Sequence, residues 1–233
     1  MAQSLSKLYI FDYDRTIAET ENLKTLAQQV ILEDYLWTGS NQGSVEQPWQ
    51  SIEKIIIDAL TNYFWRSATL EEIDQAKLRR ENEVIRLSKT IWVEVYVGIP
   101  ELLKRLHEHF FIALVTGNTR KVGPYLLEAA WVNSLFHSDF NVYWDEFPNS
   151  SRSQAIQLCI DRVENCIWKK LDSVIYVWDA RSDIIAWKEA WVKTIALAHS
   201  VYAQASDLML EQPDIFLASC EDITQTYKSF LLL

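Results

Sequence analysis

Two aspartates at alternate positions, Asp12 and Asp14, directly follow a short apolar run at residues 8–11. Such a run is typical of a buried β-strand, and open α/β sheets bind ligands just beyond the carboxyl ends of their strands. Two ionised carboxylates this close repel each other, so a bound cation or a raised pKa on one of them is the usual remedy. The alternative is an ordinary turn, where Asp is common.

Both remedies suit phosphoryl transfer. A hard divalent cation such as Mg²⁺ takes oxygen ligands and binds through one or two carboxylates and a phosphate oxygen. One aspartate could then attack phosphorus to form an aspartyl-phosphate, while the other handles the proton of the leaving group and of the attacking water. We therefore expect the pair to mark a site of phosphate chemistry.

A second candidate follows the apolar run at residues 111–115, where the chain reads Thr116, Gly117, Asn118. A hydroxyl, a flexible glycine and exposed backbone N–H groups at a helix start would together cradle a phosphate. The alternative is a helix N-cap supplied by Thr or Asn.

Two further candidates carry charge. Asp179 and Asp183 follow the run at residues 174–177 and could both face a cation near Asp12, although Asp183 could instead serve only the helix dipole. Arg152 opens a predicted helix over 154–163 and could hold a phosphate; a solvated surface arginine is the alternative. All of these groups would share one edge of a parallel sheet.

The apolar runs alternate with helical patterns, which predicts βαβ units and a parallel sheet, hence an α/β fold. The expected strands span residues 8–11, 111–115, 174–177 and 194–197, with a weaker one at 140–143. Residues 17–93 break the alternation, because they show helical patterns at 23–37, 52–65 and 70–89 and a polar loop at 38–48. We expect a core of residues 1–16 and 94–233 and a separate helical domain of residues 17–93.

Composition narrows the class of protein. The 233 residues are 49% apolar and carry a net charge of −10, which is typical of a globular chain and argues against a nucleic-acid partner. The expectations from the remaining patterns are no membrane span and no secretory signal. Three cysteines without metal-site spacing favour a reduced, cytoplasmic setting, with Cys159 packed in the core.

With these residues in view, the chain resembles the haloacid dehalogenase superfamily. Asp12-Tyr13-Asp14-Arg15-Thr16 is similar to its first motif, Thr116-Gly117-Asn118 to its second, Arg152 to its basic third, and Asp179 with Asp183 to its acidic fourth. The resemblance implies a Rossmann-like parallel sheet flanked by helices, with an inserted all-helical cap domain between the first two motifs. It points to the phosphatase branch, with a phosphoglycolate phosphatase-like layout, because dehalogenases lack the second aspartate.

The resemblance also implies a role for each residue. Asp12 would be the nucleophile and Asp14 the general acid and base. Thr116, Gly117, Asn118 and Arg152 would bind the phosphoryl group. Mg²⁺ would be held by Asp12, the backbone carbonyl of Asp14, Asp179 and Asp183.

Three positions depart from the family pattern. Trp178 stands where glycine is usual and could crowd the site. Arg15 stands where many relatives have glycine. Lysine is commoner than arginine at the third motif, so Lys121, Lys169 and Lys170 are alternatives to Arg152.

The sequence thus predicts a Mg²⁺-dependent phosphatase acting on a small-molecule phosphomonoester through an aspartyl-phosphate. The second hypothesis is a phosphotransferase or phosphomutase with the same intermediate. The third is a catalytically idle protein on this fold, whose ten tryptophans serve a partner surface. The oligomeric state and the substrate do not follow from the sequence.

Overall fold

The structure is a computed structural model, and the description covers residues 6–36, 54, 57, 58, 60, 61, 66–147, 151–179, 192–199 and 205–233. The chain divides into two compact units. The first comprises Met1–Glu19 and Glu94–Leu233, and the second comprises Thr20–Val93.

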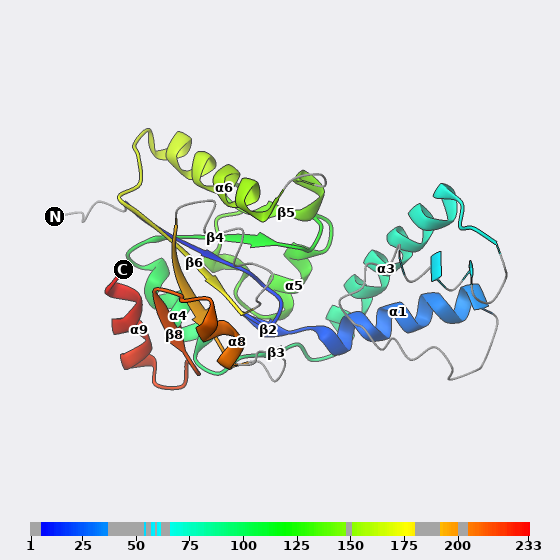
Figure 1. The fold of residues 1–233 in the computed structure, drawn as a ribbon, viewed down its shortest axis with the longest axis horizontal. Helices are drawn as coiled ribbons and strands as arrows, with labels where there is room; N and C mark the ends of the chain where they lie inside the picture. Colours follow the sequence, from blue (N-terminus) through cyan, green and yellow to red (C-terminus); the bar gives the residue numbers. More distant parts are fainter. Residues whose placement is uncertain are drawn as a thin grey trace. The chain divides into compact units, whose positions relative to one another are not determined.

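The first unit contains a six-stranded parallel sheet in the order β5-β4-β1-β6-β7-β8 (Figure 1). The strands are β1 (Lys7–Phe11), β4 (Phe111–Thr116), β5 (Val142–Tyr143), β6 (Ser173–Trp178), β7 (Lys193–Leu197) and β8 (Ile215–Leu217). The predicted Rossmann-like α/β class is therefore confirmed, and the expected strands are found within two residues of their predicted bounds. The three-residue β8 was not predicted, because so short a run has no readable period.

Helices cover both faces of this sheet. Helix α6 (Arg152–Ile167) packs on β4 and β5, and α4 (Ile99–His107) and α9 (Ile223–Leu231) pack together on the opposite face (Figure 1). The shorter helical segments are α5 (Gly123–Ala129), α8 (Ala205–Leu210), η1 (Asn133–Leu135) and η2 (Trp144–Glu146).

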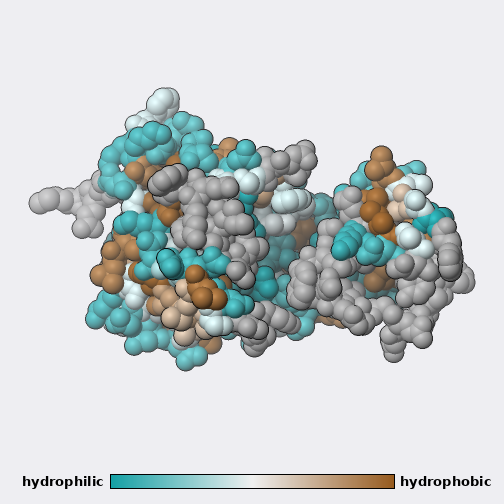
Figure 2. Space-filling view, viewed as in Figure 1, coloured by the Kyte–Doolittle hydropathy of each residue, from teal (hydrophilic) through white to brown (hydrophobic). Residues whose placement is uncertain are grey.

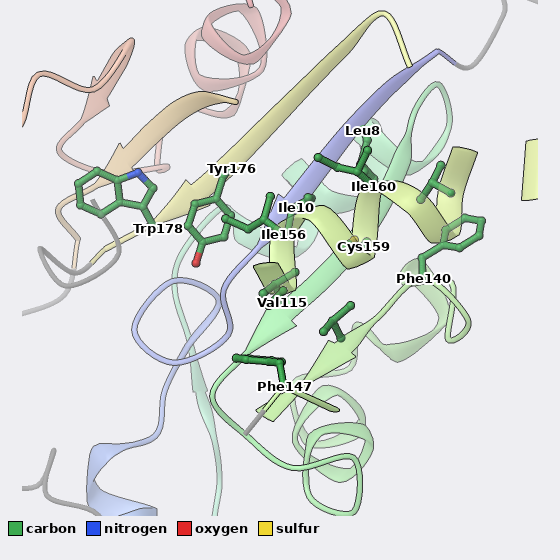
Figure 3. Close-up of a cluster of buried hydrophobic side chains, with 14 of the residues drawn as sticks. Leu8, Ile10, Val115, Phe140, Phe147, Ile156, Cys159, Ile160, Tyr176 and Trp178 are labelled. Atoms are coloured by element: carbon green, nitrogen blue, oxygen red, sulfur yellow. The ribbon is translucent and has the colours of Figure 1, made fainter. Parts of the chain in front are cut away.

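The central strand β1 is buried on both faces, which explains its unbroken apolar sequence. Leu8 and Ile10 belong to a buried cluster that includes the inner face of α6 (Figure 3). Tyr9 and Phe11 point the other way, with ring centroids 5.7 and 6.2 Å from that of Phe230 in α9. Cys159 lies in the α6 cluster with no exposed surface, as predicted.

A short antiparallel ribbon, β2 (Ala18–Glu19) with β3 (Glu94–Val95), lies in the first unit on either side of the insertion. Gly98 follows it with φ +85°, and a Cβ at this position would lie 2.0 Å from the carbonyl oxygen of Cys220. The chain therefore requires glycine where it enters α4, and Pro100 occupies the first turn of that helix as expected.

In the second unit, α1 (Glu21–Leu36) packs against α3 (Leu70–Thr90). Thr69 caps α3 through the backbone N–H of Glu72, whose side chain accepts in return from the Thr69 N–H. Both helices match the prediction. The predicted loop at 38–48 and most of the predicted helix at 52–65 lie outside the described residues.

The surface mixes polar and apolar residues, as the interspersed teal and brown regions of Figure 2 show. Trp131 and Trp168, which follow α5 and α6, are 80% and 93% exposed, whereas Trp178 is fully buried. Single exposed apolar side chains of this kind are normal. No helix within the described part of the chain is both long and apolar enough to cross a bilayer.

Candidate active site

The first aspartate is held by the sheet. The Asp12 N–H donates to the Val177 carbonyl at 3.1 Å, which extends the β1–β6 pairing by one residue, and the side chain is 6% exposed. Tyr13 is buried, and its hydroxyl donates to the Leu126 carbonyl at 2.6 Å. Burial raises the pKa of Tyr13 well above its usual value, so its hydroxyl remains a donor.

The chain then turns tightly through Asp14, Arg15 and Thr16. Arg15 has φ 61°, in the left-handed region, and its N–H donates to the Ala18 carbonyl at 2.8 Å. His199, just past β7, places Nε2 at 3.1 Å from the carbonyl oxygens of both Arg15 and Thr16. These contacts fix the loop that carries the second aspartate.

Arg152 reaches the first aspartate from α6. Ser151 caps this helix in a reciprocal pair with Gln154, so Arg152 is its first residue. The Arg152 Nη1 donates to Asp12 Oδ1 at 3.3 Å, to the Val115 carbonyl at 3.3 Å and to the Tyr176 hydroxyl at 3.5 Å. This geometry favours Arg152 for the third motif.

Two of the three lysine alternatives lie elsewhere. Lys169 and Lys170 follow the far end of α6, where they pair with Asp172 at 3.7 Å and Glu164 at 2.5 Å. Lys121 is exposed.

The second motif contacts the second aspartate. The side-chain amide of Asn118 donates to Asp14 Oδ2 at 3.0 Å and to Thr116 Oγ1 at 3.0 Å. One backbone N–H of the predicted phosphate cradle is engaged, because the Asn118 N–H donates to Thr116 Oγ1 at 3.2 Å. The Thr116 hydroxyl offers a local acceptor, and α5 begins only at Gly123, with Pro124 in its first turn.

Gly117 has no left-handed φ, so backbone freedom is not what calls for glycine there. A Cβ at this position would meet no atom within 4 Å among the described residues. With respect to the described residues, the loop therefore leaves open space beside Gly117.

Asp179 is 2% exposed and follows β6 directly. Its Oδ1 accepts from the Thr16 hydroxyl at 3.3 Å, and its Oδ2 lies 3.3 Å from the Arg15 Nε. Asp183 lies outside the described residues. Within the described part of the chain, no three His, Cys, Asp or Glu side chains form a metal-binding group. The carboxylates of Asp12 and Asp179 are nevertheless the oxygen donors that Mg²⁺ prefers.

Trp178 belongs to the buried cluster on the α6 side, together with Tyr176 (Figure 3). The Trp178 side chain, which we expected to crowd the site, is therefore part of the core. Two residues at the site were missed, Tyr176 and His199. His199 could have been found, since it is polar and follows the end of a predicted strand, as Asp12 and Asp179 do.

The family model for haloacid dehalogenase-like hydrolases matches residues 9–197. The chain belongs to this family. The matched range contains the residues of all four motifs. The match and the pyrophosphatase relative confirm the prediction that the chain is a hydrolase enzyme of the phosphatase type.

Similar proteins come from several bacteria. Pyrophosphatase PpaX of Halalkalibacterium halodurans is 25% identical over 92% of this chain and 93% of its own length. A proposed beta-phosphoglucomutase from Thermotoga maritima has a TM-score of 0.70 at 19% identity, and covers 96% of this chain and 99% of its own. A predicted phosphoglycolate phosphatase from Haemophilus somnus has the same TM-score and coverages at 18% identity. These two structures show the fold that the hydrolase shares.

Proposed function

We propose that this hydrolase is a Mg²⁺-dependent phosphatase that removes phosphate from a small-molecule phosphomonoester through an aspartyl-phosphate on Asp12. The observation that carries the proposal is the direct contact among the four motifs. Asp12 meets Arg152, Asp14 meets Asn118, and Thr16 meets Asp179. The residues that follow β1, β4 and β6 and the first residue of α6 thus meet beyond the carboxyl ends of these strands.

In the first step, an Asp12 carboxylate oxygen attacks phosphorus and the ester P–O bond breaks, while Asp14 gives a proton to the leaving oxygen. In the second step, Asp14 takes a proton from water and the water oxygen bonds to phosphorus. The bond between phosphorus and the Asp12 oxygen breaks, which frees inorganic phosphate and regenerates the Asp12 carboxylate. Arg152 would hold the phosphoryl oxygens, because its guanidinium already lies against Asp12. Thr116, Gly117 and Asn118 would complete the phosphate site.

Asp12, the backbone carbonyl of Asp14, Asp179 and Asp183 would hold Mg²⁺. The ion would offset the negative charge on the phosphoryl oxygens. Charge stabilisation of this kind and positioning must supply most of the acceleration, because uncatalysed phosphate-ester hydrolysis is among the slowest reactions known.

Residues 17–93 would act as a helical cap that excludes water and contacts the organic part of the substrate. The proposed setting is the cytoplasm, with neither nucleic acid nor membrane as a partner. In this helical segment, Arg66, which precedes α3, pairs with Glu72, and Arg86 in α3 pairs with Glu83, each at 2.5 Å.

The test is phosphate release with Mg²⁺, using p-nitrophenyl phosphate and, because of the PpaX relative, inorganic pyrophosphate. Asp12→Asn should lower the rate about a thousandfold or more, since it removes the nucleophile. Asp139→Asn, which alters an exposed carboxylate, should match the wild type. Chelation of Mg²⁺ should abolish the reaction.

Full activity in Asp12→Asn would contradict the proposal. Failure of the folded wild type on a broad panel of phosphate esters would favour the idle binding protein. Transfer of phosphate to a sugar hydroxyl without free phosphate would favour the phosphotransferase or phosphomutase.

A further inference from the structure

Arg15 projects from a backbone that is fixed on both sides. Its N–H donates to the Ala18 carbonyl, and its own carbonyl contacts His199 Nε2. The His199 ring in turn stacks on Tyr96, with centroids 4.0 Å apart. The left-handed φ of Arg15 is strained for a non-glycine residue, so the local backbone alone favours glycine here.

The side chain of Arg15 contacts Asp179. The Arg15 Nε lies 3.3 Å from Asp179 Oδ2, and the two side chains are 24% and 1% exposed. A carboxylate so deeply buried needs a compensating positive charge. Arg15 supplies that charge in this structure.

We propose that Arg15 sets the divalent-cation affinity of the site, because its guanidinium is the counter-ion of Asp179 that an arriving cation must displace. The inference rests on the proposed function, in which Asp179 is a metal ligand. Two cations at one carboxylate oxygen repel each other, so the ion pair and the metal bond exclude one another.

The size of the effect follows from the strength of such pairs. An opposite charge within about 4–6 Å stabilises an Asp carboxylate by about 1–3 pKa units, and each unit corresponds to about a tenfold change in a binding constant. Removing the Arg15 charge should therefore tighten cation binding about tenfold.

The experiment is isothermal titration calorimetry of Mg²⁺ into the substrate-free protein. Arg15→Gly suits the left-handed backbone and should fold, which circular dichroism checks; Arg15→Gln removes the charge but keeps most of the side chain. Both should lower the Kd for Mg²⁺ about tenfold. Arg105→Gln, which breaks an exposed pair with Glu101 in α4, is the matched control and should leave the Kd unchanged.

Asp179→Asn assigns the binding to this site, because it should weaken Mg²⁺ binding in both the wild-type and Arg15→Gln backgrounds. The loss should be about tenfold larger in the Arg15→Gln background, where no ion pair competes with the cation for Asp179. If the wild type binds Mg²⁺ and both Arg15 variants bind it equally or more weakly, the inference is wrong while the proposed function stands. If neither the wild type nor any Arg15 variant binds Mg²⁺, the inference and the proposed function both fail.

Discussion

The cluster under α6 and the carboxyl edge of the sheet use the same strands in opposite ways. On β1, Ile10 is buried among apolar side chains, and two residues later Asp12 contacts Arg152. On β6, Trp178 is buried in the same cluster, and the next residue, Asp179, pairs with Arg15. Residues that pack in the core and residues that carry the buried charges thus lie next to each other along the same part of the chain.

The two regions also balance their energies differently. Burial of apolar surface stabilises the cluster without any directional requirement. The buried carboxylates at the edge are costly unless a cation or a donor meets each of them. Mutations in the cluster should therefore change stability, and mutations at the edge should change binding, rate and pH dependence.

The largest expected difference is at Ile10. Ile10→Ala should lower the free energy of unfolding by about 2–5 kcal/mol, because it leaves a cavity in the cluster. Urea denaturation measures this loss. The phosphatase rate of the folded fraction should stay near that of the wild type, whereas Asp12→Asn should lose the rate and keep the stability. A folded Ile10→Ala protein without activity would contradict this separation of stability in the cluster from activity at the edge.

The next largest effect is a pH dependence of the free energy of unfolding, caused by His199 at the carboxyl edge of the sheet. Burial lowers the pKa of His199 to about 4 from 6.5, so between these values the unfolded chain binds more protons than the native one. The stability contributed by neutral His199 is complete above pH 6.5 and is lost as the pH falls towards 4, by up to about 1.4 kcal/mol per pH unit.

His199→Gln should flatten this part of the curve of unfolding free energy against pH. Ile10→Ala should shift the whole curve down by a constant amount. Equal slopes for His199→Gln and the wild type between pH 6.5 and 4 would show that another group titrates.

The smallest effect concerns Tyr176, which belongs to both regions. Its ring lies in the cluster, and its hydroxyl accepts a hydrogen bond from Arg152 at 3.5 Å. Tyr176→Phe should change the free energy of unfolding by less than about 1 kcal/mol and raise KM a few-fold, because Arg152 keeps its other contacts. A loss of stability with unchanged KM would show that Tyr176 contributes only to the stability of the cluster.

Much of the fold was predictable because both faces of the sheet are covered. Residues 8–11 and 174–177 are unbroken apolar runs for that reason, and the structure extends each by only one or two residues. The ribbon of β2 and β3 was missed because two-residue strands have no periodicity. The sequence also indicated no start residue for α5. This helix begins at Gly123, after a loop in which the Thr116 hydroxyl accepts from the Asn118 N–H.

The sequence by itself determined which strands end in carboxylates, since alternation and apolar runs are local properties of the chain. The tertiary structure decided which cation meets each carboxylate: Arg152 pairs with Asp12 across 140 positions, and Arg15 pairs with Asp179. It also decided that the Trp178 indole lies in the core. These outcomes depend on strand order and helix placement, which bring distant residues together and which no local pattern records.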